Sequence, residues 1–528
     1  MNSSFCNICK KLVPSDRVER DGKVYLVKKC DACGPNETLI SNDAVRSAQK
    51  RTLDVEVAHS YEGCDLKCFS CRRHQGLKFT FVYVTNHCNL NCPICFDNVP
   101  GLGFDFEPPM EYFDTIFKHL SQMPKPPVVI LFGGEPTTRK DLFDIIKLSR
   151  SYGLTTRIFT NGLKLADEEF CRELLKTRVG INFSYDGGNP ETYRVIRGSV
   201  KAMELKQKAL DNIARNADLL HKKVILTVVF AKGLNDTEIP EILKFCHDRR
   251  NIITTAFLMP MIHTWDSAKW GYDPPRMTTE DIENLVEKAF PGYHVEFLPL
   301  GVVHEFAAVL TSVGKDTNVY AGAHPNCESI YQLFSDGKQW LPMAHFLKTS
   351  ESKVARALLL MNKRHKEREQ RWQRNFGGRV LGAIRLRKAA LGVIGATEMG
   401  ALLLRHVRFA RLMKGWGPAK LYHAVMAPLE LMVGCKSVNV RRRHLNGQEE
   451  LRLVVLPLED NSVLETERLE RCPTGHVYFD PRKKKMVFVP VCAWKLHNKE
   501  ALRNIADYYA QRAEQQVTSD TRQVTRDK

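Results

Sequence analysis

The 528-residue sequence predicts an α/β protein organised around a partial (β/α)6 barrel. Six short β-rich segments alternate with longer amphipathic segments between residues 79 and 260, a pattern typical of parallel strands joined by right-handed helical crossovers. The chain is too long for a single hydrophobic core, so we expect two to four domains. Ten of the 16 cysteines fall within the first 95 residues, which predicts a metal-binding region ahead of the barrel.

The six expected strands are apolar and rich in β-branched residues. They are FTFVYV from residue 79, VVILFG from 128, TTRIFT from 155, VGINFSYD from 179, VILTVVF from 224 and TTAFLMP from 254. Helices are expected between them over Phe143–Ser151, Asp167–Lys176, Met203–Leu220 and Glu238–Asp248. Functional groups in such folds gather at the carboxyl ends of the strands.

The cysteine spacing also bears on the cellular compartment. Gaps of two or three residues suit metal ligands better than disulfides, which indicates a reducing environment. The amino-terminal stretch MNSSFCNICKKL lacks the apolar core of a signal peptide, and no run of about 18 apolar residues occurs. We therefore expect a cytoplasmic protein without a transmembrane segment, either free or peripherally bound at a membrane.

A four-cysteine metal site is predicted within the first 40 residues. Cys6 and Cys9 are followed twenty residues later by Cys30 and Cys33, and two such turns direct four thiolates at one tetrahedral ion. A zinc-ribbon-like site and a rubredoxin-like iron site use the same ligands, so the sequence leaves zinc and iron open.

Two further cysteine trios share one spacing, with three and then two residues between the thiols. The first is Cys64, Cys68 and Cys71, upstream of the barrel, and the second is Cys88, Cys92 and Cys95, directly after the first strand. Three thiolates on a four-iron cluster leave one iron without a protein ligand, where another molecule can bind. The place of the second trio after a barrel strand indicates that it is the catalytic one.

Two motifs carry a family resemblance. HCNLNCPIC at 87–95, followed by LFGGEPTTR at 131–139, resembles the radical S-adenosylmethionine (SAM) superfamily over residues 78 to 262. In that family the second trio holds a 4Fe-4S cluster and the GGEP turn binds the amino group of SAM, a role that carries over to Gly133, Gly134 and Glu135. Glycines let the backbone approach a ligand closely.

Softer matches extend this resemblance. FTNG at 159–162, FSYDG at 183–187 and YRVIRGS at 193–199 resemble segments that in the family follow the third and fourth strands. Contacts to the ribose and carboxylate of SAM would then come from Asn161, Ser184 and Asp186. Each of these residues also suits a plain turn or strand-end cap.

The resemblance implies one-electron chemistry. A reduced cluster cleaves SAM to a 5′-deoxyadenosyl radical, which abstracts hydrogen from carbon. A reductant protein such as ferredoxin or flavodoxin would supply the electron. The first trio would hold an auxiliary 4Fe-4S cluster, and the cysteine count allows a second one. Further auxiliary ligands are sought among Cys327, Cys435, Cys472 and Cys492.

Positive charge is concentrated in residues 353–444. This segment holds 21 lysines and arginines against four glutamates and no aspartate, a net charge of +17 out of +18 for the whole chain. Arg405, Arg408 and Arg411 have the spacing of one helical face. The pattern fits a phospholipid substrate or an anionic membrane surface, and it equally fits a solvated charged face. Aromatic residues are too sparse for a nucleic-acid surface, so we expect no nucleic-acid partner.

The overall plan is similar to the archaeal tetraether lipid synthases and the related pterin-methylating enzymes. We expect C–C bond formation on lipid chains, with radical methylation of a pterin or another small molecule as the alternative. An electron-transfer or metal-dependent binding protein is a third class, but it leaves the GGEP turn unexplained. The expected domains are a four-cysteine domain (1–40), an auxiliary-cluster segment (41–77), the barrel (78–300), a basic helical region (301–445) and a carboxy-terminal α+β region (446–528).

Overall fold

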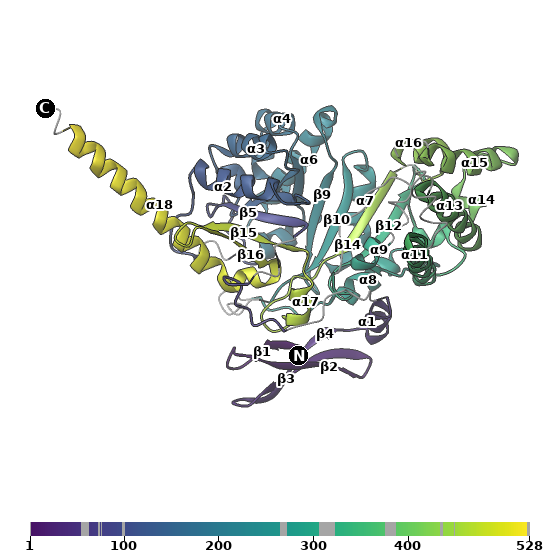
Figure 1. Cartoon of the computed structure of the whole chain (residues 1–528), viewed down its shortest axis with the longest axis horizontal. Helices are drawn as coiled ribbons and strands as arrows, with labels where there is room; N and C mark the ends of the chain where they lie inside the picture. The colour runs from purple at the N-terminus through teal and green to yellow at the C-terminus, as the bar shows by residue number, and fades with distance from the viewer. Residues whose placement is uncertain are drawn as a thin grey trace.

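The computed structural model describes most of the chain. The described residues are 2–53, 63–71, 74, 77–97, 101–263, 272–305, 323–374, 387–432, 437–447 and 449–524. The amino-terminal part is a four-stranded antiparallel sheet of β1 (Ser3–Phe5), β2 (Leu12–Arg20), β3 (Lys23–Cys30) and β4 (Gly34–Ser41), here called the ribbon. It lies below the main body of the molecule in Figure 1.

A parallel six-stranded sheet forms the centre of the molecule, which confirms the predicted barrel. Its strands are β5 (Phe79–Thr85), β6 (Val128–Gly133), β7 (Thr156–Thr160), β8 (Gly180–Ser184), β9 (Val224–Phe230) and β10 (Ile253–Pro260). The helices of this part are α2 (Met110–Ser121), α3 (Leu142–Ser151), α4 (Glu168–Lys176), α5 (Pro190–Thr192), α6 (Lys201–Arg215), α7 (Ile239–Asp248) and α8 (Thr279–Lys288). The strands are mostly apolar because helices cover the sheet, and polar exceptions such as Arg157, Asn182 and Thr227 line the cavity inside the barrel.

Strands from the carboxy-terminal third extend this sheet at both edges. β14 (Glu449–Val455) pairs in parallel with β10, and β15 (Thr474–Asp480) pairs in parallel with β5. The remaining strands are β11 (Leu298–Pro299), β12 (Ser329–Ser335), β13 (Trp340–Pro342) and β16 (Lys485–Pro490), which complete one 12-stranded sheet. The strands of the predicted carboxy-terminal region, residues 446–528, therefore belong to the same sheet as the barrel strands.

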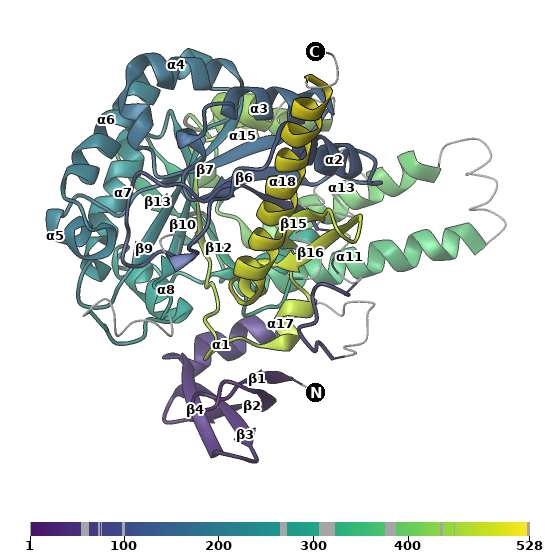
Figure 2. The same ribbon diagram turned by 90° about the vertical axis from the view of Figure 1, so that its left-hand side faces the viewer.

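The basic region is helical. The helices of this region are α11 (Glu351–Arg374), α13 (Arg387–His406), α14 (Phe409–Leu412), α15 (Pro418–Met432) and α16 (Ser437–His444). The helices elsewhere are α1 (Ala44–Arg51), α9 (Leu300–Glu305), α17 (Thr466–Glu470) and α18 (Trp494–Val524). α11 and α13 run side by side and project from the body (Figure 2). Within the described ranges, no helix is both long and apolar enough to span a membrane.

One detail of the basic region differs from our expectation. Arg405 lies in the last turn of α13, whereas Arg408 precedes α14 and Arg411 lies within α14. The two helices are separate because the chain leaves the helical path at the buried Val407. Val407 N still donates to the Leu403 carbonyl, but Arg408 N donates to the Phe346 carbonyl beside the bridge between Val407 and Leu347, so helical bonding stops after Val407. The prediction that the three arginines share one helical face is wrong.

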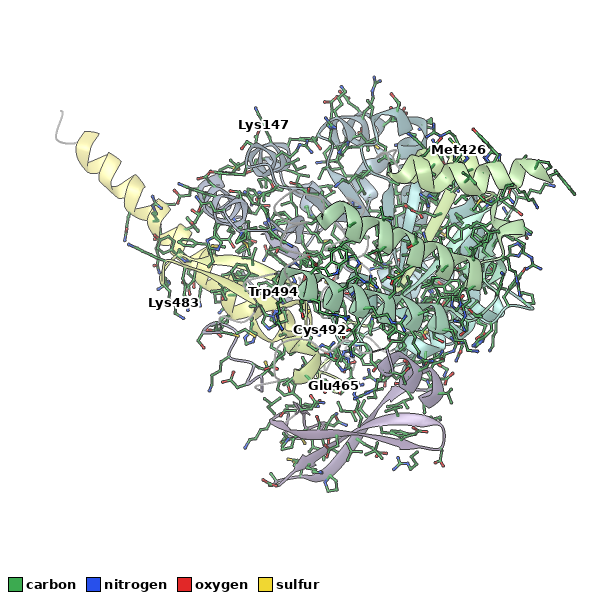
Figure 3. The ribbon with its side chains drawn as sticks, turned by 45° about the vertical axis from the view of Figure 1, so that its right-hand side comes forward. Lys147, Met426, Glu465, Lys483, Cys492 and Trp494 are labelled. Carbon is green, nitrogen blue, oxygen red and sulfur yellow. The ribbon has the colours of Figure 1, made fainter. Side chains whose placement is uncertain are left out.

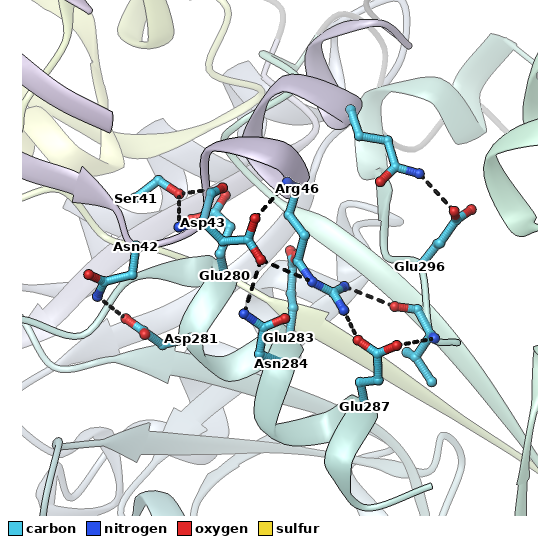
Figure 4. A network of polar contacts seen from close by, with 12 residues as sticks. Ser41, Asn42, Asp43, Arg46, Glu280, Asp281, Glu283, Asn284, Glu287 and Glu296 are labelled. Atoms are coloured by element: carbon cyan, nitrogen blue, oxygen red, sulfur yellow. Dashed lines mark hydrogen bonds and ion pairs between the residues drawn. The ribbon is translucent and has the colours of Figure 1, made fainter. Parts of the chain in front are cut away.

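α1 is tied to the barrel by a polar network (Figure 4). Arg46 forms an ion pair with Glu287 of α8 and donates to the Val295 carbonyl at 2.9 Å. The buried Lys50 ammonium lies 2.7 Å from Glu280 and 2.9 Å from Glu283, so its charge is paired. Buried pairs of this kind fix an orientation more than they add stability.

The ribbon contacts the segment that connects β14 with β15. Arg17 donates to both carboxylate oxygens of Glu465, and the buried Lys28 ammonium donates to the Ser462 carbonyl. Burial and the nearby Arg276 lower the pKa of Lys28 to about 8, against the attraction of Asp460. Figure 3 shows Glu465 just above the ribbon, with Cys492 farther toward the barrel.

Candidate active site

The ribbon holds a compact group of four thiols. The ligand atoms of Cys6, Cys9, Cys30 and Cys33 all lie within 4.8 Å of one another, and the Sγ atoms of Cys9 and Cys30 are 3.7 Å apart. Asn36 Nδ2 donates to Cys6 Sγ at 3.3 Å. The four donors fit one tetrahedral metal ion, as the spacing predicted.

The second trio lies at the carboxyl end of β5, where the sequence placed it. Cys88, Cys92 and Cys95 line a cavity of about 320 Å³ within the barrel. The Cys92 carbonyl accepts from Cys95 N at 3.1 Å, and Cys88 Sγ accepts from Leu90 N at 3.4 Å. These local bonds fold the loop so that all three residues border the cavity. None of the first trio borders it.

The geometry of this trio fits a cluster better than a single ion. Among the residues that the structure describes, only the ribbon thiols form a group of potential ligands within 4.8 Å. The three thiols of the second trio are therefore not all within 4.8 Å of one another, a wider spacing that suits a four-iron core. Burial raises the pKa of Cys88 to about 12, whereas bound iron stabilises a thiolate.

The GGE turn packs, backbone to backbone, against the loop after β5 that carries Cys88, Cys92 and Cys95, here called the cluster loop. Gly134 N donates to the Thr85 carbonyl and Glu135 N to the His87 carbonyl, both at 2.8 Å. A Cβ on Gly133 would lie 2.2 Å from the Thr85 oxygen, and one on Gly134 would lie 2.2 Å from the His87 oxygen. The glycines are thus required for the approach of two backbone segments, and both also line the cavity.

The carboxylate of Glu135 is fully engaged within the protein. Oε1 accepts from the Thr137 amide at 3.0 Å, the Thr137 hydroxyl at 2.6 Å and the Thr160 hydroxyl at 2.7 Å. Oε2 accepts from Asn161 N at 2.6 Å. Burial raises the pKa of Glu135, although these donors partly offset that effect. This side chain fastens the GGE turn to the end of β7.

Asn161 and Ser184 border the cavity, whereas Asp186 does not. Asn161 Nδ2 donates to Asn89 Oδ1 of the cluster loop at 2.7 Å. Asp186 is completely buried and accepts two hydrogen bonds of 2.7 Å from Arg197. Burial alone would raise the pKa of Asp186, but Arg197 and Lys206 lower it below its usual value.

Arg197 and Lys206 are site residues that our sequence reasoning did not name. Arg197 lines the cavity and interacts with the Cys92 thiol, and Lys206 donates to Ser184 Oγ at 3.1 Å. Burial, reinforced by Arg197, lowers the pKa of Lys206 to about 8. The YRVIRGS segment contains Arg197, but the role of Arg197 depends on a backbone conformation that cannot be predicted from the motif.

That shape is a π-helical turn. Tyr193–Arg197 forms the turn, and Gly198 ends it with a φ of +71°. A Cβ on Gly198 would lie 3.2 Å from the Asn91 carbonyl of the cluster loop. The extra residue in the turn therefore brings Arg197 beside the cysteines, in keeping with the frequent use of π turns at functional sites.

The deeper cavity wall combines aromatic and isolated polar side chains. The aromatic lining residues are Phe79, Phe81, Phe96, Phe132, Phe159, Phe257 and His476. The polar lining residues beyond the SAM-side group include Arg157, Asn182, Thr227 and Glu328. Arg157 donates to Asn182 Oδ1 at 2.5 Å and to the Ile181 carbonyl at 2.8 Å. Such a cavity suits a flat ligand with a few polar edges.

The open side of the partial barrel is covered by the connection between β14 and β15. Val455 of β14 lies opposite Leu258, and Thr474 of β15 lies opposite Phe79, so residues 456–473 run from the last barrel strand to the first. Leu456, Leu458 and Thr474 line the cavity. The cavity is thus closed on this side by a segment far from the barrel in sequence.

Three of the four remote cysteines gather at this covering segment. Cys327, Cys472 and Cys492 are close enough to affect one another electrostatically, and burial raises the pKa of Cys472. Cys492 Sγ accepts from Glu459 N at 3.5 Å. Cys435 lies outside the described residues. Cys171 and Cys246 are buried on α4 and α7.

The first trio forms a separate group beside the carboxy-terminal hairpin. Burial, together with the nearby Cys64 and Cys71, raises the pKa of Cys68 to about 12. Phe69 lies 4.9 Å from the His497 ring of α18 and accepts from Lys485 of β16 through its carbonyl. Cys64 and Cys71 are the thiols that act electrostatically on Cys68, whereas Cys327, Cys472 and Cys492 act on one another.

Comparison with known proteins agrees with this geometry. Residues 82–246 match the radical SAM superfamily, and residues 2–42 match the HMPTM N-terminal zinc ribbon domain. The chain therefore carries a radical SAM domain and is a radical SAM enzyme, which uses a 4Fe-4S cluster, SAM and an external reductant.

Two individual proteins are similar to parts of this chain. A 7,8-dihydro-6-hydroxymethylpterin dimethyltransferase of Methanocaldococcus jannaschii is 28% identical over 65% of this chain and 70% of that protein. A GTP 3′,8-cyclase of Listeria monocytogenes is 32% identical over 37% of this chain, which spans 57% of that protein.

Solved structures give weaker matches. The structure of Streptococcus suis SuiB bound to S-adenosylmethionine is 16% identical, with a TM-score of 0.31 over 52% of this chain and 68% of that one. A radical SAM methyltransferase from Sphaerobacter thermophilus is 13% identical, with a TM-score of 0.33 over 53% of this chain and 75% of that one.

Proposed function

We propose that this radical SAM enzyme methylates a pterin or a related flat nitrogen heterocycle. The observation that carries the proposal is the cavity in which the cluster cysteines and the GGE glycines face an aromatic wall. The similarity to the pterin dimethyltransferase supports it, because it covers 65% of this chain. The expectation of C–C bond formation on lipids receives no such support and becomes the second candidate.

The residues present fit the cofactors of this chemistry. We assign the cluster to Cys88, Cys92 and Cys95. SAM would contact the backbone of the GGE turn, Asn161 and Ser184, and Arg197 would neutralise its carboxylate. Asp186 and Lys206 then position Arg197 and Ser184 through the bonds described above. When bound, the cluster and SAM supply one-electron chemistry that activates a carbon–hydrogen bond.

We assign auxiliary clusters to the two remaining thiol groups. One would use Cys64, Cys68 and Cys71, and the other Cys327, Cys472 and Cys492. The first group lies beside α18, and the second lies in the segment that covers the cavity. The iron content of the reconstituted protein should fall by about one cluster when the cysteines of either group are changed to Ala, while the SAM cluster is retained.

The test of the proposed function is a turnover assay. The reconstituted enzyme, reduced with dithionite or with a ferredoxin or flavodoxin, is incubated with SAM carrying a deuterated methyl group and with 6-hydroxymethyl-7,8-dihydropterin. Mass spectrometry should show the label on the pterin. SAM cleavage without labelled pterin, under conditions where the pterin binds, would refute methylation of this substrate.

One observation favours the lipid candidate. A second cavity of about 1000 Å³ lies at the amino ends of the barrel strands and shares Phe79, Arg157, Ile225 and Phe257 with the first. Its lining is mainly apolar, and its cations are Arg157, Lys222, Lys223, Arg441, Arg442 and Arg452. Three glutamates also line it, so the rim is net positive. An anionic lipid with an apolar chain would suit such a chamber.

The two candidates differ in what stimulates SAM cleavage. Detergent-solubilised anionic phospholipid should raise turnover if a lipid is the substrate, and binding to anionic vesicles should fall as salt is added. The pterin candidate predicts neither effect. If lipid stimulates turnover and pterin does not, the lipid candidate replaces the first.

A further inference from the structure

The cavity presents three buried polar groups for which the structure gives no hydrogen bond. Thr227 Oγ1 of β9 and His476 Nδ1 of β15 are buried without a partner among the described residues. Glu328 is 9% exposed as a residue, and its carboxylate accepts no hydrogen bond from the described part of the chain. All three residues line the cavity, and they come from three separate elements.

Such groups are costly unless something completes them. A buried donor or acceptor left unpaired loses its hydrogen bonds to water without replacement, and a buried carboxylate loses more than a neutral group. Phe81, which lines the cavity, and Trp494, which does not, both stack on the His476 ring, at centroid distances of 5.1 and 4.3 Å, and Phe81 has no polar side-chain atom to offer Nδ1. A ligand that carries its own donors and acceptors would satisfy them.

Their arrangement selects the ligand's chemistry. A carboxylate recognises two parallel N–H donors on one edge of a flat ring, such as the amino group and adjacent ring N–H of a 2-aminopyrimidinone. A hydroxyl and an imidazole nitrogen accept or donate at the remaining polar atoms. Apolar faces of Phe132, Phe159 and Phe257 border the same space and suit the ring plane.

We propose that Glu328 is the residue that selects the heterocycle, by binding its amino-pyrimidinone edge, with Thr227 and His476 completing the recognition. This inference rests on the proposed function and names the part of the substrate that the cavity reads. It also gives the covering segment a role, since Arg468 of α17 is the positive charge that acts on Glu328. Arg468 itself is held by Glu459 at 2.7 Å.

The alternative role of Glu328 is that of an iron ligand, because it follows Cys327. The two roles separate in a Glu328→Gln variant, which keeps the shape of the side chain but exchanges one acceptor for a donor. Loss of recognition leaves the iron content and the electron paramagnetic resonance spectrum unchanged. Loss of a ligand lowers the iron content.

The experiment measures binding to the reconstituted full-length protein without turnover. The probes are 6-hydroxymethylpterin and 6-hydroxymethyllumazine, in which a carbonyl oxygen replaces the 2-amino group, and quenching of their fluorescence reports the dissociation constant. The wild type should prefer the pterin by about tenfold or more. Glu328→Gln should weaken pterin binding by about the same factor and change lumazine binding by less than about threefold. Thr227→Val should weaken both probes.

Each outcome decides the inference. Pterin binding that Glu328→Gln leaves unchanged would overturn the role of Glu328 while the proposed function stands. A lower iron content in this variant would also overturn it, in favour of a ligand role. If the wild type binds neither probe, the proposed pterin substrate fails and the inference fails with it.

Discussion

At the scale of single residues, the site depends on backbone contacts that side-chain motifs only suggest. The GGE glycines were predicted from sequence, but the expected reason was approach to a ligand. The structure adds a stronger constraint, since the Thr85 and His87 carbonyls already occupy the space of a Cβ. Arg197 was not predicted, because its place depends on a π-helical turn that an ordinary helical pattern does not reveal.

Gly134→Ala should therefore disrupt the SAM cluster. The added Cβ would meet the His87 oxygen at 2.2 Å, and the cluster loop would have to shift, at a cost of about 1–3 kcal/mol. We expect lower cluster occupancy by absorbance and a strong loss of 5′-deoxyadenosine formation. Gly188→Ala is the matched control, since nothing lies within 4 Å of its Cβ position. Equal behaviour of the two variants would contradict the account.

Arg197→Lys should weaken SAM binding while preserving charge. Lysine cannot reproduce the two parallel bonds to Asp186, so the cation would no longer be held beside the cluster loop. We expect the dissociation constant for SAM, measured by equilibrium dialysis, to rise about tenfold. Arg194→Lys on the same turn is the control, because Arg194 is exposed and pairs only with Glu191 in the described contacts. Unchanged SAM affinity in Arg197→Lys would remove Arg197 from the site.

At the scale of elements, sequence periodicity was reliable for the barrel and uninformative for its edges. All six predicted runs form strands, because a strand buried on both faces is mostly apolar along its length. The pairing of β14 with β10 and of β15 with β5 was not foreseen, since edge pairing is set by contacts between distant residues. The remote cysteines could be named as candidates, but their grouping depends on that pairing.

The start of α11 should make stability depend on pH. Burial raises the pKa of Glu351 to about 7, although the Tyr331 hydroxyl donates to it at 2.9 Å. The folded state thus holds a proton that the unfolded state releases near pH 4.5, so stability falls as pH rises from about 4.5 to 7. Glu296 and His294 also act on this carboxyl.

Glu351→Gln should remove this dependence. Relative to wild type, the variant should gain on the order of 3 kcal/mol between pH 4.5 and pH 8, as measured by denaturant unfolding. Glu367→Gln changes an exposed carboxylate on the same helix and should leave the wild-type pH profile intact. A wild-type profile in Glu351→Gln would show that Glu351 is ionised throughout.

At the scale of the whole molecule, the ribbon is an anchor for the segment that covers the cavity. Arg17 and Lys28 bind Glu465 and Ser462 of the covering segment. The same segment, residues 456–473, also contains Leu458 and Cys472. Four thiolates around one ion supply most of the stability of so small a sheet. We therefore expect a metal bound by the ribbon to stabilise the cavity wall without contacting it.

Removal of the ribbon metal should loosen the covering segment. A variant with Cys9→Ser and Cys33→Ser should lose the bound ion and exchange amide hydrogens faster over residues 456–473, as measured by mass spectrometry. Lys29→Ala is the control, because its ion pair with Asp16 is exposed within the ribbon. Protection of residues 456–473 that survives loss of the ion would show that the ribbon and the cavity are independent.

The pairing of β15 with β5 also sets an order of events during synthesis. Thr474 must meet Phe79, which leaves the ribosome 395 residues earlier (474 versus 79). At about 5–20 residues per second, the first barrel strand waits roughly 20–80 seconds for its edge partner. During that interval the cluster loop after β5 has been made while the open side of the barrel is still uncovered. Iron delivery to the nascent chain has its widest access then, before residues 456–473 close the entrance.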